Sequence, residues 1–158
     1  MTKTNPLLLC GLIAGAIAGA PAFAGTVRVT NDVMVQEKTV AADGTTRIAL
    51  VPAKRVTPGD RVVYRTSYRN EVGQPVEGMI VSNPVPANLV YRGPAEGSPA
   101  PEVSTDGKTF APLAQLQVRA GSATRRALAE DVKVVRWRIA SAVPVGGSGQ
   151  YAFEATLK

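Results

Sequence analysis

Histidine is absent from this chain of 158 residues, and its single cysteine, Cys10, lies close to the amino terminus. Imidazole and thiolate groups provide most of the general bases and nucleophiles of enzymes, and they are common metal ligands. The chain also lacks the G-x-S-x-G and S-x-x-K motifs that mark an activated serine. These absences predict a protein that is not an enzyme and that carries no cofactor.

Carboxylates are too scattered to replace the missing residue types. Glu130 and Asp131 are sequence neighbours in an expected loop, where adjacent acids point apart into solvent. Asp43, Asp60 and Asp106 each stand alone beside a glycine, without the D-x-D spacing of a calcium loop. We therefore predict that these three aspartates form turns and that the chain has no metal site.

Long hydrophobic runs are also missing, apart from a short apolar stretch over residues 7–20. Lys3 precedes this stretch, Pro21 ends it, and Ala-Phe-Ala at 22–24 has the pattern of a cleavage site. A membrane-spanning helix needs about 20 apolar residues, so a cleaved signal peptide over residues 1–24 is favoured. The expected location is the periplasm, the cell surface or the extracellular medium, with no transmembrane segment after cleavage.

Acidic residues are outnumbered in the mature chain, which begins at Gly25. Loss of Lys3 with the signal peptide leaves 17 basic and 12 acidic residues, a net charge of +5. Outside the cytoplasm this excess favours an anionic glycan, lipopolysaccharide phosphate or an acidic envelope or surface protein over nucleic acid. The alternative is that the charge only keeps a small domain soluble.

Alternation with a period of two residues is the main pattern that is present. In residues 61–69 it puts Val62, Tyr64, Thr66 and Tyr68 on one face, which we expect to face the core. Short strands of this kind recur along the chain, and we expect further ones at 134–139 and 150–157. Trp137 alternates with polar residues and is predicted to lie in the core.

Proline and glycine divide these strands. Thr57-Pro58-Gly59-Asp60 has the composition of a β-turn, and Asp106-Gly107 that of a hairpin. Asn83-Pro84-Val85-Pro86 must lie at a corner or an edge strand, because each proline removes a ladder donor. Residues 123–131 are expected to be a loop with a helical turn. Together these patterns predict an all-β, Greek-key β-sandwich of about seven to nine strands.

Six motifs, in order, resemble one conserved-repeat module of bacterial surface proteins, the family called domain of unknown function eleven. They are T-P-G-D-R-V-V-Y, S-Y-R-N, I-V-S-N-P-V-P-A-N-L-V-Y, S-T-D-G-K-T-F, V-V-R-W-R-I and G-G-S-G-Q-Y-A-F-E-A. The resemblance covers residues 55–158 and implies an immunoglobulin-like sandwich in the envelope or at the surface, with no catalytic residues. Two features depart from the family. Asn83 stands where the family often has aspartate, and this chain has room for one copy of a module that typically occurs in tandem. Residues 25–54 are expected to form a hairpin or added edge strands.

Outward-facing arginines are the candidate partner-binding residues. Three share one face of the strand at 61–69, and we expect two more to join them if their strand shares the sheet. The five residues are Arg61, Arg65, Arg69, Arg136 and Arg138. The alternative is a solvated face whose charges discourage edge pairing.

The sequence therefore predicts an exported, non-enzymatic interaction or structural module. One alternative is binding of an anionic glycan or lipopolysaccharide through the arginine face. Another is a subunit of a surface fibre that exchanges the strand at 27–35 with its neighbour. The oligomeric state stays open.

Overall fold

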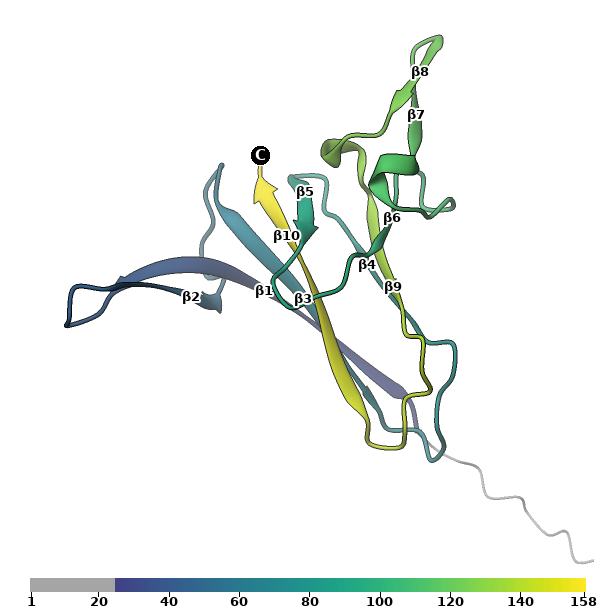
Figure 1. Cartoon of the computed structure of the whole chain (residues 1–158), viewed down its shortest axis with the longest axis horizontal. Helices are drawn as coiled ribbons and strands as arrows, with labels where there is room; N and C mark the ends of the chain where they lie inside the picture. Colours follow the sequence, from purple (N-terminus) through teal and green to yellow (C-terminus); the bar gives the residue numbers. More distant parts are fainter. Residues whose placement is uncertain (1–24) are drawn as a thin grey trace, which may run out of the picture.

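The computed structural model describes residues 25–158, apart from the side chains of residues 37–39 and 47–48. The predicted signal peptide lies outside the described residues. The described chain is all-β, as predicted, and has ten strands rather than seven to nine (Figure 1). Within residues 25–158, no helix is long and apolar enough to cross a bilayer.

Five strands form the larger, antiparallel sheet, in the order β2-β1-β3-β10-β5. Their bounds are β1 Val27–Val40, β2 Thr46–Pro52, β3 Arg61–Asn70, β5 Leu89–Pro94 and β10 Ser148–Leu157. The central strand β3 pairs over its whole length with both β1 and β10. Side chains on each face of β3 therefore have neighbours from β1 on one side and from β10 on the other.

Three strands form a smaller antiparallel sheet in the order β4-β9-β6, and a separate hairpin projects beside it (Figure 1). The sheet consists of β4 Ile80–Pro84, β6 Glu102–Ser104 and β9 Val134–Arg138. The hairpin pairs β7 Gln117–Ala120 with β8 Ala123–Arg126. Two short 3-10 turns cover Leu113–Gln115 and Ala129–Asp131.

One apolar core lies between the two sheets. The larger sheet contributes Val62, Tyr91, Phe153 and Ala155, and the smaller sheet contributes Val81, Val103, Val135 and Trp137. Trp137 is 3 % exposed, stacks on Tyr151 at 5.3 Å between ring centroids, and donates its indole N–H to the Pro99 carbonyl at 2.9 Å. Its predicted core position is confirmed, and its one polar atom is satisfied inside that core.

The inward face of β3 follows the predicted alternation. Val62 and Thr66 are buried, while Tyr64 and Tyr68 pack against the core. Thr66 is held by a short polar chain: Asn83 Nδ2 donates to its hydroxyl at 3.1 Å, and that hydroxyl donates to Asn31 at 2.7 Å. These bonds tie β4 of one sheet to β3 and β1 of the other, so the buried polar groups are paired.

The prolines after Asn83 lie where the sequence predicts. Pro84 ends the edge strand β4, and Pro86 begins the turn that leads to β5 by accepting from the Leu89 amide at 2.9 Å. The Thr57–Asp60 turn also forms, with Gly59 at φ +94° and a bond from the Asp60 amide to the Thr57 carbonyl. Glycine fits that third position because positive φ strains other residues.

The segment at 123–131 differs from the expected loop. Its first half is strand β8, and only Ala129–Asp131 makes a helical turn. The physical reason is pairing: β8 finds a partner in β7, which single-strand periodicity does not reveal.

Candidate functional site

The five predicted arginines do not share one face. Arg61, Arg65 and Arg69 lie on β3 in the larger sheet, whereas Arg136 and Arg138 lie on β9 in the smaller one. The expectation of one cationic face is therefore wrong. Strand β9 pairs with β4 and β6 and never with β3, so the two sets of arginines belong to different sheets.

The two arginines of the smaller sheet share one glutamate. Glu102 Oε2 accepts from Arg136 at 2.7 and 3.0 Å and from Arg138 at 3.2 Å. The Arg136 guanidinium also stacks on the Phe110 ring, 3.7 Å from its centroid, and its side chain is only 15 % exposed. The hydrogen bond from Arg136, more than any other contact, lowers the pKa of Glu102. In this group, the Glu102 cluster, each guanidinium has a carboxylate partner.

Arg65 and Arg61 occupy different surroundings on β3. Arg65 lies 3.5 Å from the Asp32 carboxylate, and its Nε is buried without a hydrogen-bond partner among the described residues. Arg61 is exposed at the opposite end of β3 from Arg69, about 26 Å away at the usual strand rise. A small ligand cannot contact both ends of this strand.

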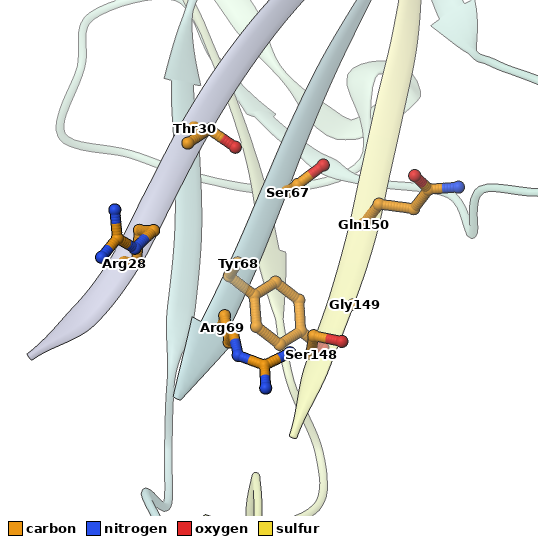
Figure 2. Close-up of a pocket in the computed structure, with 8 residues that line it drawn as sticks. All are labelled: Arg28, Thr30, Ser67, Tyr68, Arg69, Ser148, Gly149 and Gln150. Carbon is orange, nitrogen blue, oxygen red and sulfur yellow. The ribbon is translucent and has the colours of Figure 1, made fainter. Parts of the chain in front are cut away.

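A shallow pocket surrounds Arg69 on the outer face of the larger sheet (Figure 2). Its volume is about 350 Å³, and three neighbouring strands line it. Cross-strand pairing sets out its side chains in two rows, Arg28–Arg69–Ser148 and Thr30–Ser67–Gln150. We call this the Arg69 pocket. It presents guanidinium, hydroxyl and amide groups, which together can donate several hydrogen bonds to one oxyanion.

The two arginines of the pocket differ in their partners. Arg28 makes a bidentate pair with Glu71 at 2.8 and 3.1 Å, and the hydrogen bond from Arg28 is the largest cause of the lowered pKa of Glu71. Arg69 is exposed and has no hydrogen-bond or ion-pair partner among the side chains that the structure describes. Arg28 is thus held in place, and Arg69 carries the free charge.

The floor of the pocket is fixed by close packing. A side chain on Gly149 would overlap the Tyr68 ring and hydroxyl, so the absence of a side chain at this position lets the Tyr68 ring lie over β10. The neighbouring Asn70 is fully buried, and its Nδ2 donates to the carbonyls of Val143 at 2.9 Å and Gln74 at 3.0 Å. These contacts hold the strand ends that carry Arg69 and Ser148.

A second hollow of about 560 Å³ continues from the pocket along the same face and shares Gln150 with it. Its apolar lining comes from Met34, Leu50, Val63, Ala95 and Ala152, and its polar lining from Gln36, Arg65, Glu96, Ser98, Gln150 and Glu154. We call this hollow the groove. Arg65 is part of its lining, so the outer face of the larger sheet carries two adjoining hollows, one at Arg69 and one at Arg65.

The aspartates that could bind calcium are used within their own turns. Asp43 accepts from the amide and hydroxyl of Thr45, and Asp60 does the same with Thr57. Asp106 accepts from the amides of Lys108 and Thr109, and these bonds hold its pKa far below the usual range. Their role as turn residues follows from these bonds.

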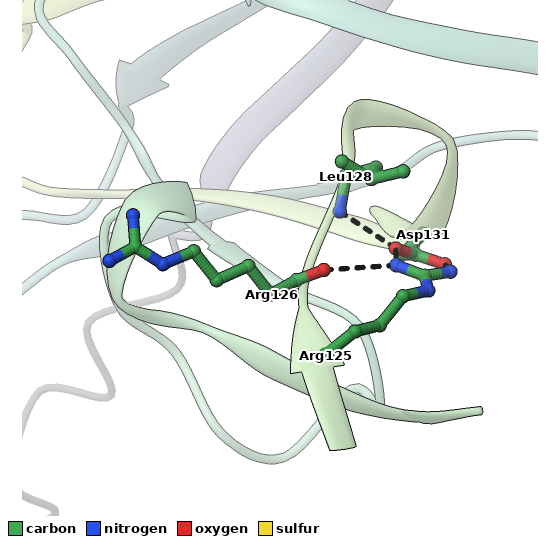
Figure 3. Close-up of polar contacts among 4 residues, drawn as sticks. All are labelled: Arg125, Arg126, Leu128 and Asp131. Atoms are coloured by element: carbon green, nitrogen blue, oxygen red, sulfur yellow. Dashed lines mark hydrogen bonds and ion pairs between the residues drawn. The ribbon is translucent and has the colours of Figure 1, made fainter. Parts of the chain in front are cut away.

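Asp131 has a structural role that the sequence did not indicate. Its carboxylate accepts two bonds from Arg125, at 2.6 and 2.9 Å, and one from the Leu128 amide at 2.7 Å (Figure 3). These contacts lower its pKa, with the Arg125 hydrogen bond as the largest cause. The expectation of a solvated acid pair is wrong for Asp131, because β8 brings Arg125 beside it.

Sequence reasoning found Arg69 but missed the rest of the pocket. Arg28, Thr30, Ser148 and Gln150 lie far from it in the chain and reach it only through the registers of β1 and β10 on β3. No local motif reports such a register. Alternation within β1 does predict which of its residues share a face, and that is the only signal available.

Comparisons of the chain with protein-family models, with curated proteins and with solved structures found no match. The resemblance to the conserved-repeat module therefore rests on the sequence motifs alone.

Proposed function

We propose that this chain is an exported, non-enzymatic interaction module of the cell envelope that binds an anionic glycan or lipopolysaccharide at the Arg69 pocket. In this proposal residues 1–24 are a cleaved signal peptide, and the two sheets form an immunoglobulin-like sandwich related to the conserved-repeat module. The mature protein acts in the periplasm or at the cell surface.

The observation that carries the proposal is the free charge of Arg69. Each of Arg28, Arg136 and Arg138 has a carboxylate partner within 3.2 Å, whereas Arg69 has none among the described side chains. An unpaired guanidinium among hydroxyl and amide donors suits phosphate and carboxylate groups.

Strand exchange in a fibre is less well supported. Residues 27–35, which would be the exchanged segment, pair with β3 in their own sheet. Donating this segment to a neighbour would break that pairing and uncover Val33 and Val35, which pack on the core.

The test compares two charge reversals on the same strand. Arg69→Glu removes the free cation, and Arg61→Glu makes the same change on an exposed arginine outside the pocket. We expect Arg69→Glu to weaken retention on immobilised lipopolysaccharide by about tenfold or more, since it replaces attraction with repulsion. Arg61→Glu should change retention by about twofold or less.

Both variants should fold normally, because each side chain is exposed, and circular dichroism checks this. Equal losses in both variants would mean that net charge alone drives binding. Retention unchanged by Arg69→Glu would refute the proposed site.

A further inference from the structure

The larger sheet carries opposite charges at the two ends of one continuous hollow surface. The Arg69 pocket, at one end, contains two arginines and no carboxylate in its lining. The adjoining groove contains Glu96 and Glu154 together with Arg65, which is already near Asp32. A ligand that lies along both hollows therefore meets positive charge first and negative charge beyond Gln150.

We infer that the groove is a neutral-sugar subsite and that the ligand is an oligosaccharide with its anionic group confined to one end. This inference rests on the proposed function, because the anionic end is the group bound by Arg69. A uniformly charged polymer would place further anions beside Glu96 and Glu154, which costs like-charge repulsion.

The lining of the groove suits a sugar better than an acyl chain or a polyanion. Met34, Leu50 and Ala152 offer apolar surface for the C–H faces of a ring. Gln36, Glu96, Ser98 and Gln150 offer acceptors and donors for its hydroxyl groups. An acyl chain would bury these polar groups without hydrogen bonds, which is unfavourable.

The wall of the groove is formed in advance by the loop Ala95–Ser98. The Ala95 amide donates to the Ala152 carbonyl at 3.0 Å, and the Ala152 amide donates to the Ser98 hydroxyl oxygen at 2.8 Å. A turn closes the loop through the Ser98 amide and the Ala95 carbonyl at 3.0 Å. The loop is thus attached to β10 at both ends, and Glu96 is exposed at its tip.

Gln150 joins the two subsites. It lies in the row Thr30–Ser67–Gln150 of the pocket and also lines the groove. From Arg69 to Val63 the strand spans about 20 Å, enough for a few sugar units. A ligand bridging both subsites gains from the high effective concentration of its second half once the first is bound.

Four probes test the inference by calorimetry on the mature protein secreted from the whole chain. They are a linear neutral tetrasaccharide, the same tetrasaccharide with one terminal phosphate, inorganic phosphate, and dextran sulfate. We expect the end-phosphorylated tetrasaccharide to bind at least about tenfold more tightly than either the neutral sugar or phosphate.

Charge reversal at the groove gives a second readout. Glu96→Lys should strengthen binding of dextran sulfate by about three- to tenfold, while Glu77→Lys, an exposed glutamate outside both hollows, should change it by less than about twofold. Both glutamates are on the surface, so neither change should alter folding.

Each result has a distinct meaning. Equal affinity for inorganic phosphate and the end-phosphorylated sugar, with Arg69→Glu still abolishing both, would overturn the groove subsite and leave the proposed function standing. Tighter binding of dextran sulfate than of the end-phosphorylated sugar by the wild type would also overturn it. Binding of the phosphorylated sugar that Arg69→Glu leaves unchanged would refute the proposed function itself.

Discussion

The outer faces of the two sheets carry the same residue type in opposite states. On the smaller sheet, Arg136 and Arg138 share Glu102, and Arg136 stacks on Phe110. On the larger sheet, Arg69 stands among hydroxyl and amide groups with no carboxylate bound to it in the described chain. Counting arginines therefore says little about binding, because the carboxylates decide which charges remain free.

Strand register explains the difference between the faces. Glu102 of β6 lies directly opposite Arg136 of β9, an ideal position for an ion pair across two strands. Arg69 of β3 lies opposite Arg28 on one side and Ser148 on the other. Glu71 is hydrogen-bonded by Arg28, and the charge of Arg69 helps to lower its pKa, but Arg69 itself has no hydrogen-bond or ion-pair partner among the described side chains.

The largest expected effect comes from the core that both faces share. Trp137→Ala should lower the free energy of unfolding by about 3–5 kcal/mol, because it empties a buried site and removes the bond to Pro99. Arg69→Ala, on the outer face of the larger sheet, should lower the free energy of unfolding by less than about 0.5 kcal/mol. Urea denaturation measures both, and a Trp137→Ala variant with nearly wild-type stability would contradict the packing described.

A smaller effect should follow from removing the negative charge of the Glu102 cluster. Glu102→Gln keeps the shape of the side chain but frees the charges of Arg136 and Arg138. We expect the variant to elute from a lipopolysaccharide column at higher salt than wild type. Glu77→Gln, the same change on an exposed loop residue, is the control.

Elution of Glu102→Gln at the same salt concentration as Glu77→Gln would contradict this role of Glu102. The charges on the smaller sheet would then be ineffective for a reason other than Glu102.

The smallest expected effect is the change of folding stability with pH near neutrality. The carboxylates Glu71, Glu102, Asp106 and Asp131 have lowered pKa values, so their contribution is complete above about pH 5 and is lost as the pH falls through their folded pKa values. Burial raises the pKa values of Tyr64, Tyr68 and Tyr91, so their contribution is lost only above the ordinary tyrosine value of 10.0.

With no histidine in the chain, the melting temperature should be nearly constant from about pH 5.5 to 9 and fall below about pH 4. Differential scanning calorimetry across this range checks the expectation. A clear slope between pH 6 and 8 would show that a group outside this set controls stability.

The sequence predicts the individual strands better than their arrangement. Alternation identifies the inward face of β3 and the burial of Trp137, because each strand carries its own pattern of period two. It cannot tell which strands are neighbours, so it groups Arg136 with Arg69. Val63 shows the same limit: it lies on the outward face of β3 yet is 4 % exposed, because Met34 and Glu154 flank it across the strands.

Buried polar groups were the least predictable feature. Asn70 is fully buried and donates to three carbonyls of two other segments. Such a role depends on contacts with residues more than 70 positions away. Local sequence propensity does not predict such long-range contacts.

Nuclear magnetic resonance gives the most direct test that an anion binds the larger sheet and not the smaller one. The mature protein, labelled with nitrogen-15, is titrated with the end-phosphorylated tetrasaccharide. We expect saturable shift changes at the amides of Ser67, Arg69 and Ser148, with none at Arg136 or Arg138. Changes of equal size on both faces, or changes confined to β9, would contradict it.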